Sequence, residues 1–146
     1  MEGIKMNAID FLVKEHNRVR KMLRTISDES HLYATQKKQF QLLAQDLLRH
    51  ETMEHKVWYP HFKDKLPTEV QHLLSEEKHA EKAIKKMSEL KSEEAWKKEF
   101  LKFKSDVEHH AREEETELFP EVEKLLSERE LDKIGLELFD FKMHYH

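Results

Sequence analysis

The sequence predicts an all-α protein, an up-down-up-down antiparallel four-helix bundle with a short C-terminal fifth helix. Two glycines and three prolines among 146 residues leave few sites for tight turns, which argues against a β-rich fold. Apolar residues recur in alternating steps of three and four, the spacing of one packed helix face. The connections between these segments are short, and short connections make consecutive helices antiparallel neighbours.

The first two predicted helices each carry an apolar seam that is interrupted by polar residues. Over residues 9–26 the seam is Ile9, Leu12, His16, Val19, Leu23 and Ile26. Over residues 40–61 it is Phe40, Leu43, Leu47, His50, Glu54, Val57 and His61. Pro60 predicts a kink or a loosened last turn in the second helix, because proline lacks the backbone N–H and clashes with the preceding turn.

The third and fourth predicted helices follow the same rule. Thr68 and Gln71 match a capping box at the start of the third helix, and Ser92 matches an N-cap for the fourth. The third seam is His72, Glu76, His79, Ala83, Met87 and Leu90. The fourth seam is Trp96, Phe100, Phe103, Val107, His110 and Glu114, with Pro120 near the helix end.

A short fifth helix is predicted after the bundle. Ser127 and Glu130 form a second capping-box pattern, and Leu131, Ile134 and Leu138 share one side of the segment that follows. We therefore predict one domain over residues 1–146, with a metal-binding bundle over about 7–126 and the C-terminal helix over about 128–143.

Composition excludes several classes of protein. The chain has no cysteine, which removes disulfides, cysteine-ligated zinc, iron–sulfur clusters and thiol catalysis. Its net charge of −4 argues against nucleic acid as a partner. No apolar run approaches the ~20 residues of a membrane span, and residues 1–16 hold no apolar signal-peptide core. We expect a cytoplasmic protein, a monomer or a homodimer. The count of 11 histidines is high and needs an explanation.

A repeat places some of these histidines on the seams. The second and fourth helices both read H-x-x-x-E-x-x-x-x-x-P, with an aromatic residue just before the proline. The matching residues are His50, Glu54 and Pro60, and His110, Glu114 and Pro120. The first and third helices each add one seam histidine, His16 and His79. Two copies of a helix pair pack with approximate twofold symmetry, which brings these side chains to one level of the core.

Metal ions explain why polar groups lie on apolar seams. A histidine and a glutamate four residues apart share a helix face, and burying an unpaired carboxylate costs several kcal/mol. The predicted dinuclear ligand set is His16, His50, Glu54, His79, His110 and Glu114. Each ion receives two histidines, and both glutamates bridge. Positions then stay open for an oxo or hydroxo bridge, water or a small ligand. These ligand types suit iron, and also manganese or zinc.

Other polar residues near the seams receive weaker assignments. Glu76, one turn before His79, is a candidate for a further ligand, a partner of a ligand or a charge at the rim, and Glu51 and Glu113 follow the same logic. His61 is placed to cap the site or to bond locally. His72 lies two turns, about 10.5 Å, from His79, too far for the same ion. The histidines expected in solvent are His31, His55, His109, His144 and His146.

The order of these motifs resembles the hemerythrin-like, or HHE cation-binding, family over about residues 10–126. The motifs end in Trp58-Tyr59-Pro60 and Leu118-Phe119-Pro120. The resemblance implies a non-haem centre of two iron ions (Fe²⁺/Fe³⁺) in an antiparallel bundle, held by the same six residues. Oxygen-carrying hemerythrins have a second histidine on the third helix, where this chain has Ser75 or Ala83, and a shorter acid on the fourth. The pattern is closer to the branch linked to iron handling, oxygen or nitric-oxide sensing, and iron–sulfur repair.

These features favour a metal-binding protein over a turnover enzyme. We expect a di-iron protein that binds, senses or reacts with O₂ or NO, or that handles iron. One alternative is a di-iron enzyme, such as a peroxidase, an NO reductase, a ferroxidase or an iron–sulfur repair protein. Glu76, Tyr59 and His61 are then its candidate acid–base groups near the seam. Another alternative is a structural bundle that holds zinc, because the ligand types suit both metals.

Overall fold

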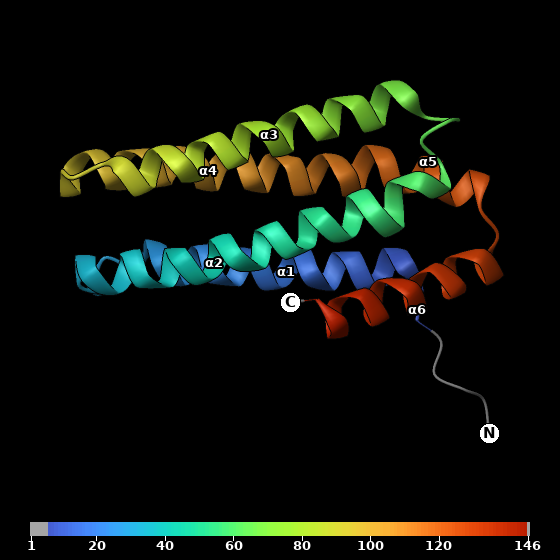
Figure 1. Cartoon of the computed structure of the whole chain (residues 1–146), viewed down its shortest axis with the longest axis horizontal. Coiled ribbons are helices and arrows are strands. Elements are labelled where there is room, and N and C mark those ends of the chain that lie inside the picture. Colours follow the sequence, from blue (N-terminus) through green and yellow to red (C-terminus); the bar gives the residue numbers. More distant parts are fainter. Residues whose placement is uncertain (1–5, 146) are drawn as a thin grey trace.

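The computed structural model describes residues 6–145, and these residues form helices and no strand (Figure 1). The α-helices are α1 (Ala8–Ser27), α2 (Tyr33–Met53), α3 (Pro67–Glu89), α4 (Glu93–Glu113), α5 (Phe119–Leu125) and α6 (Glu128–His144). Shorter π-helical and 3₁₀ segments complete the chain: η1 (Glu54–Trp58), η2 (Tyr59–His61) and η3 (Glu114–Leu118). His146, expected in solvent, lies outside the described residues. The predicted all-α bundle is confirmed.

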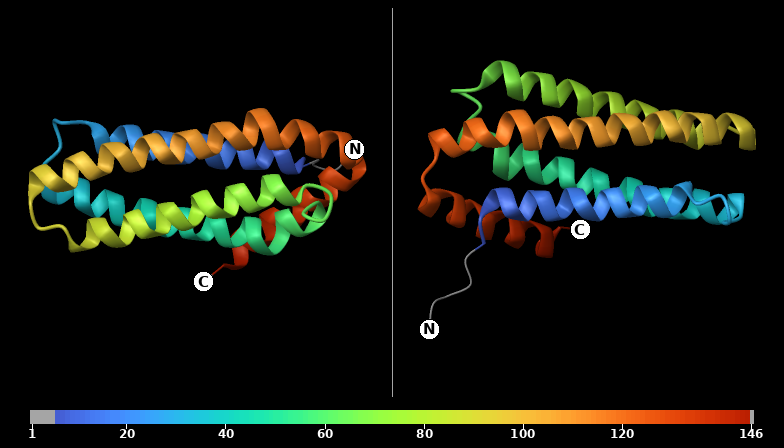
Figure 2. Two further views of the ribbon diagram at one scale, coloured as in Figure 1. Left: turned by 90° about the horizontal axis from the view of Figure 1, so that it is seen from above. Right: turned by 180° about the vertical axis from the view of Figure 1, so that it is seen from behind.

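The four long helices run antiparallel in chain order and form two pairs. Helix α1 lies beside α2, and α3 lies beside α4, as the views in Figure 2 agree. Helix α6 folds back along α1 and contacts α2 as well (Figure 1). The approach of α6 to the start of α1 is so close that a Cβ on Gly135 would lie 1.6 Å from the carbonyl oxygen of Met6. Glycine is therefore required at this point.

Two of the three helix caps that the sequence predicts are present. The Ser92 hydroxyl oxygen accepts a hydrogen bond from the Ala95 N–H, and Ser127 and Glu130 form a complete capping box. The capping box predicted at Thr68 is wrong. Helix α3 begins at Pro67, and no side chain caps it. Proline fits the first helical position because its missing N–H would have no partner there.

The seams of α1, α2 and α4 are buried as predicted. The predicted seam of α3 is buried at Met87 but is wrong at His72 and His79, which are exposed. The residues that α3 turns inward are Val70, Leu73, Glu77, Ala80, Ile84 and Met87. They also follow steps of three and four, but on a face about 100° away from the predicted one. Burial stabilises Val70 and Ile84 more than it would stabilise the histidines of the predicted face, so the aliphatic face of α3 packs into the core.

Each H-x-x-x-E motif ends in a π-helical turn, in which the Tyr59 N–H donates to the Glu54 carbonyl and the Phe119 N–H to the Glu114 carbonyl. A proline follows each turn directly. Because a proline ring clashes with the carbonyl four residues before it, a wider turn is favoured there. The extra residue moves the inward position from Val57 to Trp58. Val57 is only half-buried against the core, and the predicted place of His61 on the second seam is wrong, because its side chain is exposed.

The buried apolar side chains form two clusters with a polar layer between them. One cluster includes Trp58, Phe62 and Phe119 and joins the bundle to α6. The other includes Phe40 and Phe103 and fills the opposite end of the bundle. Such packing on both sides keeps bulk water from the polar layer.

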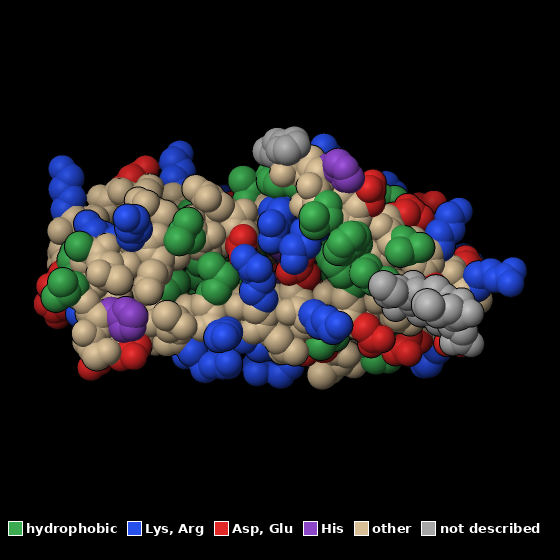
Figure 3. Space-filling model, turned by 90° about the horizontal axis from the view of Figure 1, so that it is seen from below, with side chains coloured by type: hydrophobic (Ala, Val, Ile, Leu, Met, Phe, Trp, Pro, Cys, Tyr) green, Lys and Arg blue, Asp and Glu red, His purple; other side chains and the backbone are tan. Residues whose placement is uncertain are grey.

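The outer surface is strongly charged. No helix within residues 6–145 is both long and apolar enough to cross a membrane. On the face seen in Figure 3, Lys and Arg side chains are frequent and histidines are isolated.

Candidate metal centre

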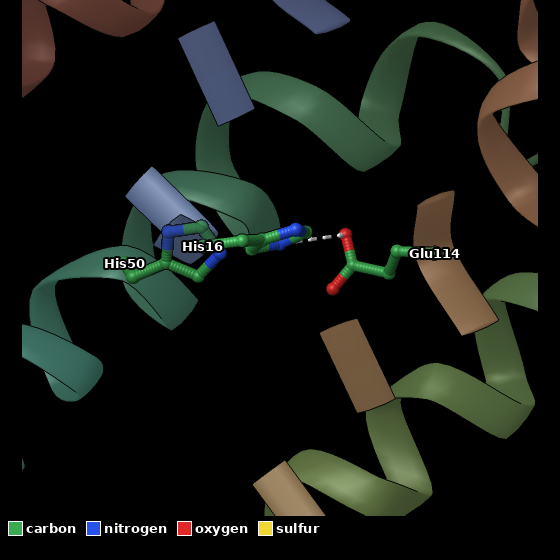
Figure 4. Close-up of side chains that lie close together, drawn as sticks. All are labelled: His16, His50 and Glu114. Atoms are coloured by element: carbon green, nitrogen blue, oxygen red, sulfur yellow. Dashed lines mark ion pairs between the residues drawn. The ribbon is translucent and has the colours of Figure 1, made fainter. Parts of the chain in front are cut away.

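The polar layer brings six histidine and glutamate side chains together from all four long helices of the bundle and their π-helical extensions. These side chains form two groups. Within each group the ligand atoms lie within 4.8 Å of one another, and Glu114 belongs to both groups. The first group is His16, His50 and Glu114, and the second is Glu54, Glu77, His110 and Glu114. Figure 4 shows the carboxylate of Glu114 reaching from the α4 side toward the imidazoles of His16 and His50.

Many of these buried atoms have no hydrogen-bond partner. They are Nε2 of His16, both ring nitrogens of His50, both oxygens of Glu54, Nε2 of His110 and both oxygens of Glu114. Glu54 and Glu114 are fully buried. An unpaired buried carboxylate is costly, and a cation shared by these nitrogen and oxygen atoms removes the cost. The donor set therefore fits a metal.

Short distances link each histidine to its own glutamate and link the two halves. Nε2 of His50 lies 3.0 Å from Oε1 of Glu54. In the other repeat, Nε2 of His110 lies 2.8 Å from Oε1 of Glu114. The second oxygen of Glu114 lies 3.9 Å from Nε2 of His16. Glu114 thus faces ligand atoms of both groups, as a bridging carboxylate must.

The structure brings together five of the six residues predicted for the site and leaves His79 out. The His79 imidazole is 60% exposed, and its Nε2 lies 3.4 Å from Oδ2 of Asp106. On α3 the structure places Glu77, rather than the predicted His79, beside the other residues of the layer. The physical reason is the rotation of α3, because the face that buries Val70 also buries Glu77 and turns His79 outward.

Glu77 is held by two side chains that follow the first H-x-x-x-E motif, His50–Glu54. The Tyr59 hydroxyl donates to Oε2 of Glu77 over 2.7 Å, and Nε2 of His55 bonds Oε1. Oε2 of Glu77 also lies 3.5 Å from Nε2 of His110. His55 is exposed, as the sequence predicts, and it contacts Glu77 from the solvent side. The signal for Glu77 lies in the sequence, since a buried glutamate interrupts an apolar run of helical spacing.

Two of the histidines have an outer carboxylate partner that sets the ring orientation. Nδ1 of His16 lies 2.8 Å from Oε2 of Glu115, and Arg20 donates to both oxygens of Glu115. Nδ1 of His110 lies 3.0 Å from Oε1 of Glu76. Of the three roles open to Glu76, the geometry favours the partner of a ligand. Both bonds leave the Nε2 atoms directed into the layer.

Burial and the charges of the polar layer shift the pKa values of its side chains. Burial lowers the pKa of His16. Burial also acts to lower the pKa of His50, but the Glu54 carboxylate outweighs it and raises that pKa to about 9. Burial and then the Glu114 charge raise the pKa of Glu54. Burial opposes the Glu115 charge, but hydrogen bonds with His16 and Arg20 lower its pKa to about 2. Such displaced titrations are typical of functional sites.

A cavity of about 290 Å³ leads from the surface between α3 and α4 to the polar layer. Its inner end includes Glu77 and His110, and Leu47 and Val107 contribute apolar wall. The cavity gives a small molecule a route to one side of the layer. His61 is not near this route, since it lies at the surface with its Nε2 3.8 Å from Glu137.

The antiparallel bundle and its buried histidine–glutamate layer define a class of helical cation-binding protein. The family model described as the hemerythrin HHE cation binding domain matches residues 7–122. Comparisons with curated proteins and with solved structures gave no significant match. The chain belongs to the hemerythrin HHE cation-binding family, and its fold and its histidine–glutamate groups agree with cation binding.

Proposed function

We propose that this chain holds two iron ions in its polar layer and uses them to bind or react with a small species such as O₂ or NO. The observation that carries the proposal is the pair of ligand groups that share Glu114, with buried donor atoms that have no other partner. Nitrogen and oxygen donors without sulfur suit iron in both common oxidation states, while zinc and manganese remain chemically compatible.

The proposed ligands divide between two positions. His16 and His50 hold one ion, and Glu77 and His110 hold the other. Glu54 and Glu114, one from each repeat, face both. A bound iron pair supplies Lewis-acid and redox chemistry at positions that the protein leaves open. Because Glu77 stands where His79 was expected, the position of Glu77 and His110 has more negative charge than the position of His16 and His50.

The surrounding side chains keep this layer oriented and dry. Glu115 and Glu76 accept from the Nδ1 atoms of His16 and His110, so each ring presents Nε2 inward. The Tyr59 hydroxyl holds the Glu77 carboxylate. The two apolar clusters pack against the layer on both sides, and the cavity between α3 and α4 gives a small molecule a route to it. At about 290 Å³ that cavity is near the lower limit for small-molecule sites, which supports a diatomic or similarly small ligand.

Anaerobic reconstitution tests the proposal. The chelator-treated chain is loaded with Fe²⁺, its iron content is measured, and its absorption spectrum is recorded before and after exposure to air or NO. We expect about two iron ions per chain and a new near-ultraviolet band after air, and we expect the His50→Ala/Glu54→Ala variant to lose the iron. A content of one ion or none contradicts the proposal. Iron binding without a spectral change contradicts the reaction with oxygen and supports the zinc-holding alternative.

The same preparation tests the enzymatic alternative. Sustained consumption of peroxide or NO, rather than a single stoichiometric reaction, indicates an enzyme. Tyr59→Phe is the variant to compare, because it removes the hydroxyl bonded to Glu77 while keeping the buried ring. Loss of turnover with full iron content in this variant assigns the hydroxyl to the reaction and overturns the non-enzymatic proposal.

A further inference from the structure

A second cluster of histidine and glutamate side chains lies at the outer end of the cavity. It consists of His72 and Glu76 on α3 and His109 and Glu113 on α4. Nε2 of His72 lies 2.9 Å from Oε2 of Glu113, and Nε2 of His109 lies 2.6 Å from Oε1 of the same carboxylate. Nε2 of His109 is also 3.6 Å from Oε2 of Glu76. The two imidazoles are 58% and 52% exposed, so solvent reaches the cluster directly.

The surface cluster has the same local design as the buried centre. His72 and Glu76 are four residues apart on one helix, as are His109 and Glu113, so each pair is a further H-x-x-x-E motif. Ligand atoms of His72, Glu76 and Glu113 lie within 4.8 Å of one another. Two imidazoles with two carboxylates are a donor set for divalent transition-metal ions. Such an ion also relieves the repulsion between the two neighbouring carboxylates.

The cluster is joined to the buried centre by a shared residue and by the cavity. Oε1 of Glu76 accepts from Nδ1 of His110, while its other oxygen belongs to the surface cluster. The cavity is lined by His72, Glu76 and His109 at the surface and by Glu77 and His110 inside. A cation bound at the cluster would therefore stand at the entrance to the ligand position of Glu77 and His110.

We propose that His72, Glu76, His109 and Glu113 form a separate surface site for a divalent transition-metal ion, which takes the ion from solvent and delivers it to the buried centre. Solvent exposure leaves the ion partly hydrated and weakly held, as an ion in transit must be. The binding of this ion stands on the surface geometry alone, whereas its delivery rests on the proposed function of the buried centre.

Anaerobic Fe²⁺ binding to the chelator-treated chain separates the two sites. The test variant is His72→Ala/His109→Ala, which leaves Glu76 in its contact with His110. The matched control is His31→Ala/His144→Ala, which removes two imidazoles that do not line the cavity. Equilibrium dialysis measures weak binding beyond the tightly held iron, and stopped flow at limiting Fe²⁺ measures the rate at which the buried centre fills.

We expect the test variant to lose the weakly held ion and to fill its buried centre about tenfold more slowly, with the same final content of tight iron. The control should match the wild-type chain in all three quantities. Equal weak binding in the test variant and the wild type, or equal filling rates, overturns this proposal and leaves the buried centre unaffected. Failure of the buried centre itself would instead show as absent tight iron in the wild type.

Discussion

Nδ1 of His16 lies 2.8 Å from Oε2 of Glu115, the residue that directly follows Glu114. The other half of the bundle has the matching relationship, because Glu77 is bonded by His55, which directly follows Glu54. The candidate ligands His16 on α1 and Glu77 on α3 are thus each held by the residue that follows the motif glutamate of the opposite helix pair. This pairing keeps the approximate twofold symmetry. On one side a histidine of the layer is bonded by a glutamate, and on the other side a glutamate of the layer is bonded by a histidine.

Removing Glu115 tests whether this pairing supports metal binding. Glu115→Ala deletes the acceptor of His16 Nδ1 and frees Arg20, so the imidazole loses its fixed orientation. Loss of such an outer partner lowers metal affinity about 10- to 100-fold. Competition with a chromogenic chelator measures the affinity, and Glu123→Ala, at an exposed position of α5, is the control. An affinity equal to the control would show that the Glu115 contact does not position His16.

A comparison of two variants on α3 decides which residue belongs to the centre. Glu77→Ala removes a buried carboxylate that lies 3.5 Å from His110, whereas His79→Ala removes an exposed ring that contacts Asp106. We expect Glu77→Ala to lose at least one tightly bound metal and His79→Ala to keep both. Elemental analysis after gel filtration measures this content. The reverse result would restore the ligand set expected from the sequence alone.

The chelator-treated chain should lose stability as the pH rises. Burial, then the charges of Glu77 and Glu81, raise the pKa of Glu51 from 4.5 to about 9. The folded chain keeps a proton that the unfolded chain releases, so the free energy of unfolding falls between pH 4.5 and about 9. The pKa of His50 is raised from 6.5 to about 9, so His50 also lowers the free energy of unfolding as the pH rises through this range.

Urea unfolding of the chelator-treated chain at about pH 6 and pH 9 measures this loss. Glu51→Gln is neutral at both pH values and should reduce the difference in midpoint between them. Bound metal should reduce it in the wild-type chain as well, because the ion replaces the protons on its ligands. An unchanged pH dependence in Glu51→Gln would mean that Glu51 does not hold its proton in the folded chain.

The contact between α6 and the start of α1 depends on a single glycine. A methyl group on residue 135 would collide with the Met6 carbonyl, so Gly135→Ala must displace one of the two segments. We expect a loss of about 1–3 kcal/mol in unfolding free energy, the usual cost of overpacking. Thermal unfolding checks this, with Leu136→Ala on the exposed side of α6 as the control. A melting temperature at or above that of the wild type would contradict the close contact.

The fold was predictable because the seams of α1, α2 and α4 each have one dominant apolar face. The buried face of α3 was not predictable in the same way. Two sets of α3 positions, offset by one residue, both follow helical spacing. The face that contains His72 and His79 is turned outward, and the face that contains Val70 and Ile84, which is more apolar, is buried. This single rotation explains why His79 was expected at the centre and why Glu77 was missed.

Two other features depend on tertiary structure and have no local signal. The π-helical turns shift the inward position by one residue after each motif glutamate, so a fixed helical period fails at Trp58. The pairing of His16 with Glu115 joins residues that lie 99 positions apart. Spacing along one helix cannot reveal such a contact, whereas it did reveal the pairs His50–Glu54 and His110–Glu114.

Anomalous diffraction at the iron absorption edge, from crystals of the iron-loaded chain, tests the central claim most directly. The predicted result is two peaks in the polar layer, one within about 2.2 Å of His16 and His50 nitrogens and one within the same distance of His110 and Glu77. Glu54 and Glu114 should lie between the peaks. A single peak, or a peak bonded to His79, would contradict the proposed two-ion centre.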